Sequence, residues 1–207
     1  ENVEVITNGF DSEDYDYSIQ KESKAGFTIG YFGLYNAGRD HSFFWDALRE
    51  LGDNESKFKE DVKFLFAGEV HHNFFNNLSM YGFEDHLEYH SYLNHGETIT
   101  CMMKCDLLLV SQGAEKAING RIPAKVFEYI GAKRPILAIG EKGSDLQKII
   151  DSVSFAWFVE FGDASAMKEA IAAIYQLRNS KEGFEDSIVE FSRAFQAKQV
   201  IELMESL

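Results

Sequence analysis

Residues 111–140 read SQGAEKAINGRIPAKVFEYIGAKRPILAIG and predict a loop, a short helix, a turn and a buried strand, in that order. Pro123 suits the first position of a helix, because the missing N–H of proline would have no partner there. Apolar residues at three- and four-residue spacing then give the helix a buried face. Gly131 is expected to end the helix, and Pro135 forbids further helix before the apolar strand 136–139.

The start of this helix is a candidate anion site. Lys125 and Glu128 lie on one helix face, and the free N–H groups of a helix start favour an anion such as phosphate. A carboxylate one turn further in can accept hydrogen bonds from sugar hydroxyls. Although the chain has a net charge of −14, only Glu128 opposes four basic residues here: Arg121, Lys125, Lys133 and Arg134. This cluster favours binding of a small anion, but a solvated basic helix face explains it equally well.

Composition indicates one packed domain. The chain has 207 residues, of which 45% are hydrophobic, with 18 Phe and 9 Tyr, so disorder is excluded. A pI near 4.8 argues against nucleic acid as a general partner. Two cysteines form no disulfide framework, and no apolar run reaches the roughly 18 residues of a membrane span, which favours the cytoplasm. The chain begins with Glu1 rather than Met, and we expect a fragment of a longer protein.

Strand and helix patterns alternate about six times without hairpin turns, which predicts an α/β fold with a doubly wound, mostly parallel sheet. The predicted strands cover 27–35, 62–67, 86–90, 106–110, 136–139 and 155–161. Val3, Val5 and Ile6 predict a further short strand. The last helix is predicted over 187–207, with five apolar side chains partly exposed: Ile188, Phe191, Phe195, Ile201 and Met204.

The segment FTIGYFGLYNAGRD, residues 27–40, predicts a second phosphate-binding element. A strand, a glycine-bearing turn and a helix in this order bind phosphates in open α/β sheets, although neither a dinucleotide fingerprint nor a Walker A loop is present. An ion pair with Asp40 is the other interpretation of Arg39.

Four histidines at positions 71, 72, 90 and 95 suggest a metal site at first sight. Their spacing matches no recognised ligand pattern, and Cys101 and Cys105 lie beside methionines as core residues do. We therefore expect no metal site.

PAKVFEYIGAKRPILA, residues 123–138, resembles the donor-binding signature of the family 4 (group 1) glycosyltransferases, which have the two-domain GT-B fold. The resemblance implies that Glu128 holds the ribose hydroxyls of a nucleotide-sugar, that Lys125 faces its diphosphate, and that Arg121 also contacts the substrate. Gly120 occupies the position where many members carry a second glutamate near the transferred sugar.

Three other segments extend this resemblance over nearly the whole chain. GYFGLYNAGRD is similar to a turn whose basic residue reaches the diphosphate, which implies that role for Arg39, with Gly33 and Gly38 allowing close approach. HSYLNH, residues 90–95, implies that Tyr92 and Leu93 border the base. VITNGFD resembles the segment that links the two halves of such enzymes.

The resemblance implies a linker or first strand over 1–20 and a Rossmann-like nucleotide-sugar-binding domain over 21–207, with the N-terminal acceptor domain absent. It further implies a retaining hexosyltransferase of polysaccharide or glycoconjugate biosynthesis. Such an enzyme moves a sugar from a UDP- or GDP-linked donor to a glycan or lipid-linked acceptor, without a metal or other cofactor. We expect the chain alone to be inactive, and the whole enzyme to be cytoplasmic or peripheral at the inner membrane face. Two alternatives are a nucleotide-sugar epimerase of the same architecture and a non-catalytic interaction module.

Overall fold

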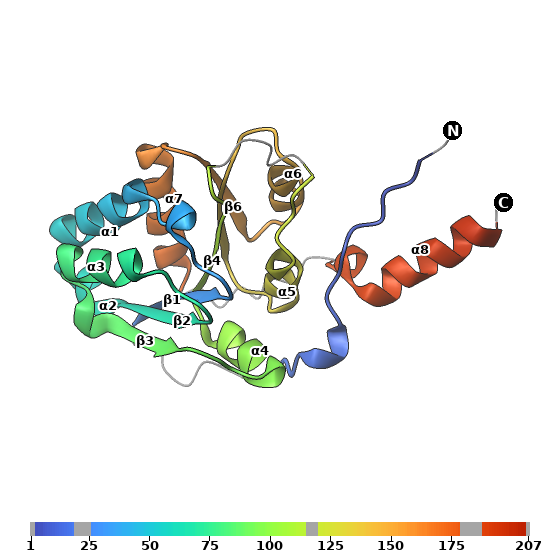
Figure 1. Ribbon diagram of the computed structural model, residues 1–207, viewed down its shortest axis with the longest axis horizontal. Helices are drawn as coiled ribbons and strands as arrows, with labels where there is room; N and C mark the ends of the chain where they lie inside the picture. The colour runs from blue at the N-terminus through green and yellow to red at the C-terminus, as the bar shows by residue number, and fades with distance from the viewer. Residues whose placement is uncertain (1–2, 19–25, 115–119, 179–187, 206–207) are drawn as a thin grey trace.

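The computed structural model describes residues 3–18, 26–114, 120–178 and 188–205, and its centre is one six-stranded sheet (Figure 1). The strand order is β3-β2-β1-β4-β5-β6, and every neighbouring pair is parallel. The predicted doubly wound parallel sheet is therefore confirmed. The strands are β1 (Phe27–Phe32), β2 (Val62–Ala67), β3 (Leu87–His90), β4 (Leu107–Ser111), β5 (Ile136–Gly140) and β6 (Ala156–Glu160).

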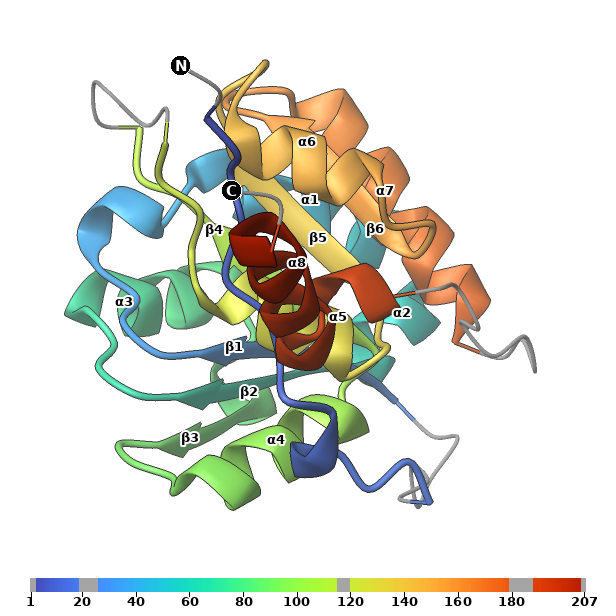
Figure 2. The ribbon, with the colours of Figure 1, turned by 90° about the vertical axis from the view of Figure 1, so that its right-hand side faces the viewer.

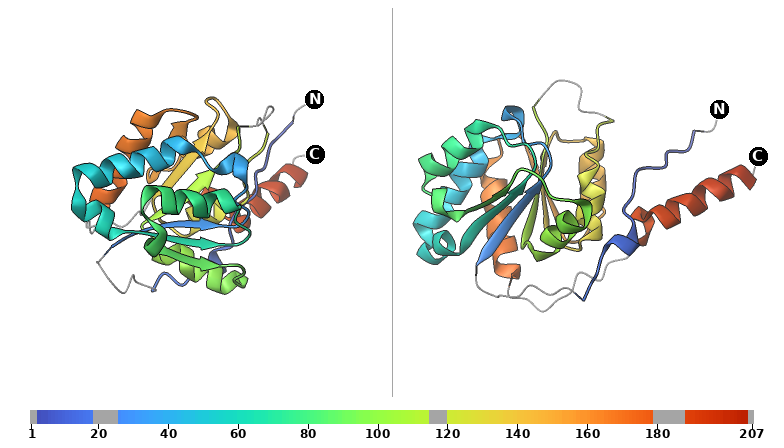
Figure 3. Two further views of the ribbon diagram at one scale, coloured as in Figure 1. Left: turned by 60° about the vertical axis from the view of Figure 1, so that its left-hand side comes forward. Right: turned by 60° about the horizontal axis from the view of Figure 1, so that its bottom comes forward.

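Helices cover both faces of the sheet, as Figure 3 shows from two sides. One face carries α1 (Ser42–Asn54), α2 (Ser56–Asp61), α3 (His72–Tyr81) and α7 (Ala164–Leu177). The other carries α4 (His95–Lys104), α5 (Lys125–Gly131) and α6 (Asp145–Asp151). Each face buries its own apolar cluster, because parallel strands that are apolar on both sides need cover on both sides.

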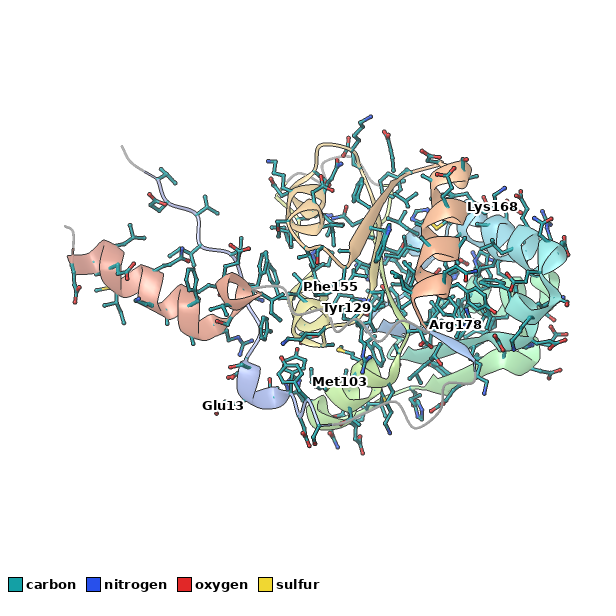
Figure 4. All side chains as sticks on the ribbon, turned by 180° about the vertical axis from the view of Figure 1, so that it is seen from behind. Glu13, Met103, Tyr129, Phe155, Lys168 and Arg178 are labelled. Atoms are coloured by element: carbon teal, nitrogen blue, oxygen red, sulfur yellow. The ribbon has the colours of Figure 1, made fainter. Side chains whose placement is uncertain are left out.

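Polar contacts fix α7 against its neighbours. Lys168 Nζ lies 3.0 Å from a carboxylate oxygen of Glu50 in α1, and Arg178 Nη2 lies 3.2 Å from a carboxylate oxygen of Asp61 in α2 (Figure 4). Asp163 caps α7 by accepting the N–H of Ala166 at 2.9 Å.

The N-terminal segment and α8 (Arg193–Glu205) lie side by side beyond the α5 side of the sheet (Figure 2). Phe10 forms a parallel β-bridge with Ser192, and Gln196 Nε2 donates to the Asn8 carbonyl at 2.7 Å. The predicted strand at Val3–Ile6 is wrong. Among the described residues no strand lies beside this segment to pair with it, and Val3 is 80% exposed.

The last predicted helix is interrupted. A short 3-10 helix, η4 (Val189–Phe191), precedes α8, and both Ile188 and Phe191 are buried in the core rather than exposed. Phe195, Ile201 and Met204 on α8 are exposed, as predicted. The predicted ends of this helix, at 187 and 206–207, and the predicted domain boundary at 20–21 lie outside the described residues.

Gly131 ends α5 as predicted, but it does not adopt the left-handed conformation that glycine often has at a helix end. The left-handed residue after the helix is Lys133, with φ 51°, whereas Gly131 is the last helical residue. A Cβ on Gly131 would lie 2.6 Å from Tyr15 Cζ, so glycine is needed for the close approach of the N-terminal segment. That segment is also tied to α5 by the Tyr15 hydroxyl, which donates to the Glu128 carbonyl at 2.8 Å.

No helix in the described part of the chain is long and apolar enough to cross a membrane.

Candidate functional site

The sheet topology places a candidate site between β1 and β4. The chain proceeds from β1 outward through β2 and β3, and then returns to β4 on the other side of β1 before continuing to β5 and β6. Loops at the carboxyl ends of β1 and β4 therefore diverge, and open α/β sheets bind ligands in the crevice at this point.

Gly33 is the first residue after β1 and leaves space for a lysine. Its φ is +104°, and a Cβ added there would lie 3.5 Å from Lys125 Nζ. Gly68, which follows β2, has φ +118°, and a Cβ there would approach the Gly33 carbonyl oxygen to 2.7 Å. Both glycines thus have a backbone conformation that other residues rarely adopt, and Gly68 also has no space for a Cβ.

Tyr129 brings α5 to the end of β1. Its side chain is fully buried in the interior (Figure 4), and its hydroxyl accepts the N–H of Phe32 at 3.1 Å. This contact fixes the helix that begins at Lys125 next to the turn at Gly33.

The ammonium nitrogen of Lys125 is buried. Its Nζ lies 3.6 Å from the centroid of the Tyr31 ring, and no hydrogen bond to it is formed within the described residues. Burial and the nearby Arg39 guanidinium lower the pKa of Lys125 to about 7, although the Glu128 carboxylate opposes this. A buried, poorly compensated ammonium is suited to an anionic ligand that supplies the missing acceptors.

Arg39 reaches the same place from the 3-10 helix η2 (Ala37–Arg39). Its Nη1 donates to the Tyr31 hydroxyl at 3.2 Å and to the Leu34 carbonyl. Its own carbonyl accepts the Ser111 hydroxyl at 2.6 Å, which links the turn after β1 to the end of β4.

Asp40 has other partners, so it does not hold Arg39 in an ion pair. Its carboxylate accepts hydrogen bonds from the Trp45 indole at 2.7 Å, the Asn77 amide at 2.9 Å and the Tyr35 hydroxyl at 3.2 Å. Asp40 thus joins α1 and α3 to the turn.

Two cavities open at this edge of the sheet. The predicted residues Gly33, Tyr92, Leu93 and Glu128 all line the smaller one, of about 240 Å³. Arg39 and Arg121 line the larger one, of about 560 Å³, together with Gly120. The structure therefore divides six of the predicted residues between two cavities. Lys125 and the exposed Gly38 line neither of these two cavities.

Glu128 is half-buried at the wall of the smaller cavity. Burial raises the pKa of this carboxyl, while His95, Lys125 and Arg193 nearby act in the opposite direction. A partly desolvated carboxylate strengthens hydrogen bonds from ligand hydroxyls.

The basic cluster predicted from the sequence is not one patch. Lys133 Nζ lies 4.6 Å above the ring of Tyr17, on the N-terminal segment. Arg134 is near Asp106, which precedes β4 and so belongs to the amino edge of the sheet, away from Lys125. Neighbours in the sequence are separated because α5 runs from one edge of the sheet toward the other.

Two of the four histidines that were predicted not to form a metal site lie beside separate carboxylates. His95 Nε2 lies 2.9 Å from a carboxylate oxygen of Asp14, and His90 Nε2 lies 2.8 Å from one of Glu88. In the part of the chain that the structure describes, no group of three or more His, Cys, Asp or Glu side chains could hold a metal ion. Cys101 and Cys105 are not joined by a disulfide.

Sequence reasoning missed three residues of this edge. Tyr31 contacts both Lys125 and Arg39. Asn36 and Gln112 line the larger cavity, and each has a buried side-chain oxygen without a hydrogen-bond donor among the described residues. Tyr31 reads as an ordinary core aromatic of a strand, and no spacing signal could have singled it out.

Comparison with known proteins shows what the fold resembles. No family model matches the chain. It is 29% identical over 128 residues to "Probable glycosyltransferase WbjE" of Pseudomonas aeruginosa, a match that covers 60% of this chain and 31% of that protein.

Two solved structures share the fold over almost the whole chain. HepE of Anabaena, solved with UDP and glucose, has a TM-score of 0.68 at 15% identity, covering 99% of this chain and 57% of that one. Sucrose-phosphate synthase of Thermosynechococcus elongatus has a TM-score of 0.71 at 13% identity, covering 97% and 51%. The chain thus has the Rossmann-like fold of about half of each of these larger proteins.

Proposed function

We propose that this chain is the nucleotide-sugar-binding half of a glycosyltransferase with the two-domain GT-B architecture. The observation that carries the proposal is the pairing of Lys125 and Arg39 at the point between β1 and β4, beside the cavity that Glu128 lines. The relative named as a glycosyltransferase, and the fold shared with a protein solved with UDP and glucose, support this substrate class.

Each predicted residue has a role in the proposed site. Lys125 and Arg39 stabilise the leaving diphosphate, and the turns around Gly33 and Gly38 let it approach the backbone. In the smaller cavity, Glu128 orients the ribose while Tyr92 and Leu93 border the base. Arg121 contacts the substrate from the larger cavity. Fixed cations in a desolvated site stabilise developing negative charge, so the proposed reaction needs no metal ion.

The proposed enzyme is a retaining hexosyltransferase that moves a sugar from a UDP- or GDP-linked donor to a glycan or lipid-linked acceptor, in polysaccharide or glycoconjugate biosynthesis. The acceptor site and the remaining catalytic groups belong to another domain of the whole protein, since this chain spans only 31–57% of the proteins compared above. We therefore expect the 207-residue chain to bind nucleotide without transferring sugar.

Thermal shift measurements with UDP, GDP, ADP, CMP and their sugars test the proposal. A ligand at a hundredfold its dissociation constant adds about 2.7 kcal/mol of stability. Lys125→Met should weaken diphosphate binding roughly 30- to 100-fold, as expected when charge-assisted hydrogen bonds are lost. Lys133→Met is the matched control, because its Nζ also lies over an aromatic ring but outside the site.

Other outcomes identify the alternatives. If no nucleotide shifts the stability of the chain, a non-catalytic interaction module replaces the proposal. If the full-length enzyme interconverts the sugar of its donor without any acceptor, the protein is an epimerase instead. Sugar transfer by the 207-residue chain alone would contradict the need for a second domain.

A further inference from the structure

Tyr31 lies at the centre of the candidate diphosphate site, between its two cations. The face of its ring is 3.6 Å from Lys125 Nζ, and its hydroxyl accepts a hydrogen bond from Arg39 Nη1 at 3.2 Å. One side chain from β1 thus contacts a residue of α5 and a residue of η2.

We propose that Tyr31 is a positioning residue that holds Lys125 and Arg39 together in the ligand-free site, ready for the two phosphates of a nucleoside diphosphate. The inference rests on the proposed function for the identity of the ligand. It assigns to Tyr31 no contact with the ligand itself.

The hydroxyl group fixes Arg39 through a closed set of hydrogen bonds. Tyr31 donates its single hydroxyl proton to the Leu34 carbonyl at 2.7 Å and accepts from Arg39 at 3.2 Å. Arg39 donates to the same Leu34 carbonyl. A long side chain loses much rotamer freedom when it binds a ligand, and an arginine that is already held in place has less to lose.

The ring itself cannot turn away from Lys125. Tyr31 has no exposed surface, and its ring stacks on Phe66 with centroids 5.4 Å apart and an interplanar angle of 19°. Tyr35 packs against it edge to face at 4.8 Å. The negative face of a buried aromatic ring attracts an ammonium group, so this rigid ring holds the lysine ammonium by a cation–π contact.

A neutral side chain suits the position of Tyr31 better than an acidic one. Burial raises the pKa of the Tyr31 hydroxyl, so the group remains uncharged at physiological pH. A carboxylate in the same place would form permanent ion pairs with Lys125 and Arg39, and a phosphate would have to displace it. Tyr31 orients both cations without neutralising them, so their positive charges can interact with the ligand.

The proximity of the two cations has a measurable effect in the free protein. After burial, the Arg39 guanidinium is the largest cause that lowers the pKa of Lys125. If Tyr31 keeps Arg39 close, loss of its hydroxyl lets the guanidinium move away, and the pKa of Lys125 rises.

A double-mutant cycle with Tyr31→Phe and Arg39→Met tests the proposal. Tyr31→Phe keeps the ring under Lys125 and removes only the hydroxyl, so it should weaken nucleoside diphosphate binding about fivefold to tenfold. It should leave the affinity for the corresponding nucleoside unchanged. In the Arg39→Met background the same change should have no further effect, because Tyr31 acts through Arg39.

Tyr175→Phe is the matched control. Tyr175 is equally buried, and its hydroxyl donates to Asp61 at 2.8 Å on the far side of the sheet from α5. This variant should bind nucleoside diphosphates as the wild type does. Additive losses in the cycle, or an equal loss of nucleoside affinity, would contradict the proposal, because both describe a general structural effect.

NMR titration of Lys125 separates failure of this inference from failure of the proposed function. Absence of nucleoside diphosphate binding by the wild type contradicts the proposed function. In the same ligand-free proteins, the pKa of Lys125 should rise in Tyr31→Phe toward its value in Arg39→Met, and the double variant should match Arg39→Met. An unchanged pKa in Tyr31→Phe overturns the positioning role whether or not nucleotide binds.

Discussion

Two partly buried charged side chains at opposite edges of the sheet have different surroundings. Asp61 ends α2 just before β2, at the amino edge, and its carboxylate accepts from Tyr175 at 2.8 Å, Lys57 at 3.1 Å and Arg178 at 3.2 Å. Lys125 begins α5 at the carboxyl edge, and its Nζ lies only over the Tyr31 ring, without a hydrogen bond in the described structure.

The pKa values follow from these surroundings. Burial by itself would raise the pKa of Asp61, but hydrogen bonds from Tyr175 and Lys57 outweigh it and lower the pKa. Burial lowers the pKa of Lys125 to about 7, and Arg39 adds to the effect. Asp61 has its partners within the chain and stabilises the fold. Lys125 has no hydrogen-bond acceptor among the described residues, so we expect it to lower the stability of the fold and to suit an anionic ligand.

The largest expected effect is at the amino edge. Asp61→Ala should lower the free energy of unfolding by about 3–5 kcal/mol, because Arg178 and the Tyr175 hydroxyl lose a shared buried partner. Since the pKa of Asp61 is depressed in the folded state, its contribution is present above about pH 4 and disappears as the pH falls further. Urea denaturation at several pH values measures the loss in the free energy of unfolding and its pH dependence. Asp85→Ala, at an exposed carboxylate, should cost less than about 0.5 kcal/mol, and an equal loss there would remove the contrast.

Lys125→Met should act in the opposite direction and stabilise the ligand-free protein. At pH 6 the gain is expected to be on the order of 2–3 kcal/mol, since the wild type must bury a charge that the unfolded chain solvates. Between the folded pKa of about 7 and the ordinary value of 10.5, the unfolded chain binds more protons than the folded one, so wild-type stability rises with pH and the gain shrinks. Urea denaturation at several pH values measures this change. A destabilised Lys125→Met variant at pH 6 would show that the lysine is a structural residue like Asp61.

The smallest expected effect is the uptake of protons when a diphosphate binds. Because a bound diphosphate stabilises the charged form of Lys125, binding above about pH 7 should take up a fraction of one proton, and affinity should fall as the pH rises. Calorimetry in two buffers of different ionisation enthalpy measures the uptake at about pH 8, where the phosphate itself, with a pKa near 6, is already ionised. Lys125→Met should abolish the uptake. Unchanged uptake in this variant would assign the proton to another group.

The elements that position the site were predictable because their signals are local. The strand predicted over 62–67 is the observed β2, whereas β1 ends at Phe32, before the predicted end at 35, because the chain turns at Gly33. Continuous apolar runs bounded by glycine or proline are typical of strands buried on both faces. The prediction at Val3–Ile6 was wrong because a strand also needs a neighbour, which a single segment does not reveal.

The residues of the predicted site stay a prediction, but the structure shows which of them lie together. Glu128, Tyr92, Leu93 and Gly33 line one cavity. Arg134, only nine positions from Lys125, lies at the other edge of the sheet near Asp106. Proximity in the sequence was therefore misleading for charges, because a helix of seven residues spans much of the distance between the two edges.

The sequence by itself determined the parallel α/β sheet and the helix that carries Lys125 and Glu128, because periodicity, proline and glycine act over a few residues. The tertiary structure alone decided that Tyr31 joins Lys125 to Arg39, and that Asp61 is paired where Lys125 is not. Such contacts depend on how α5 packs beside β1 and how α7 packs beside α2. Burial, which shifts the pKa of a charge, results from this packing and from no single segment.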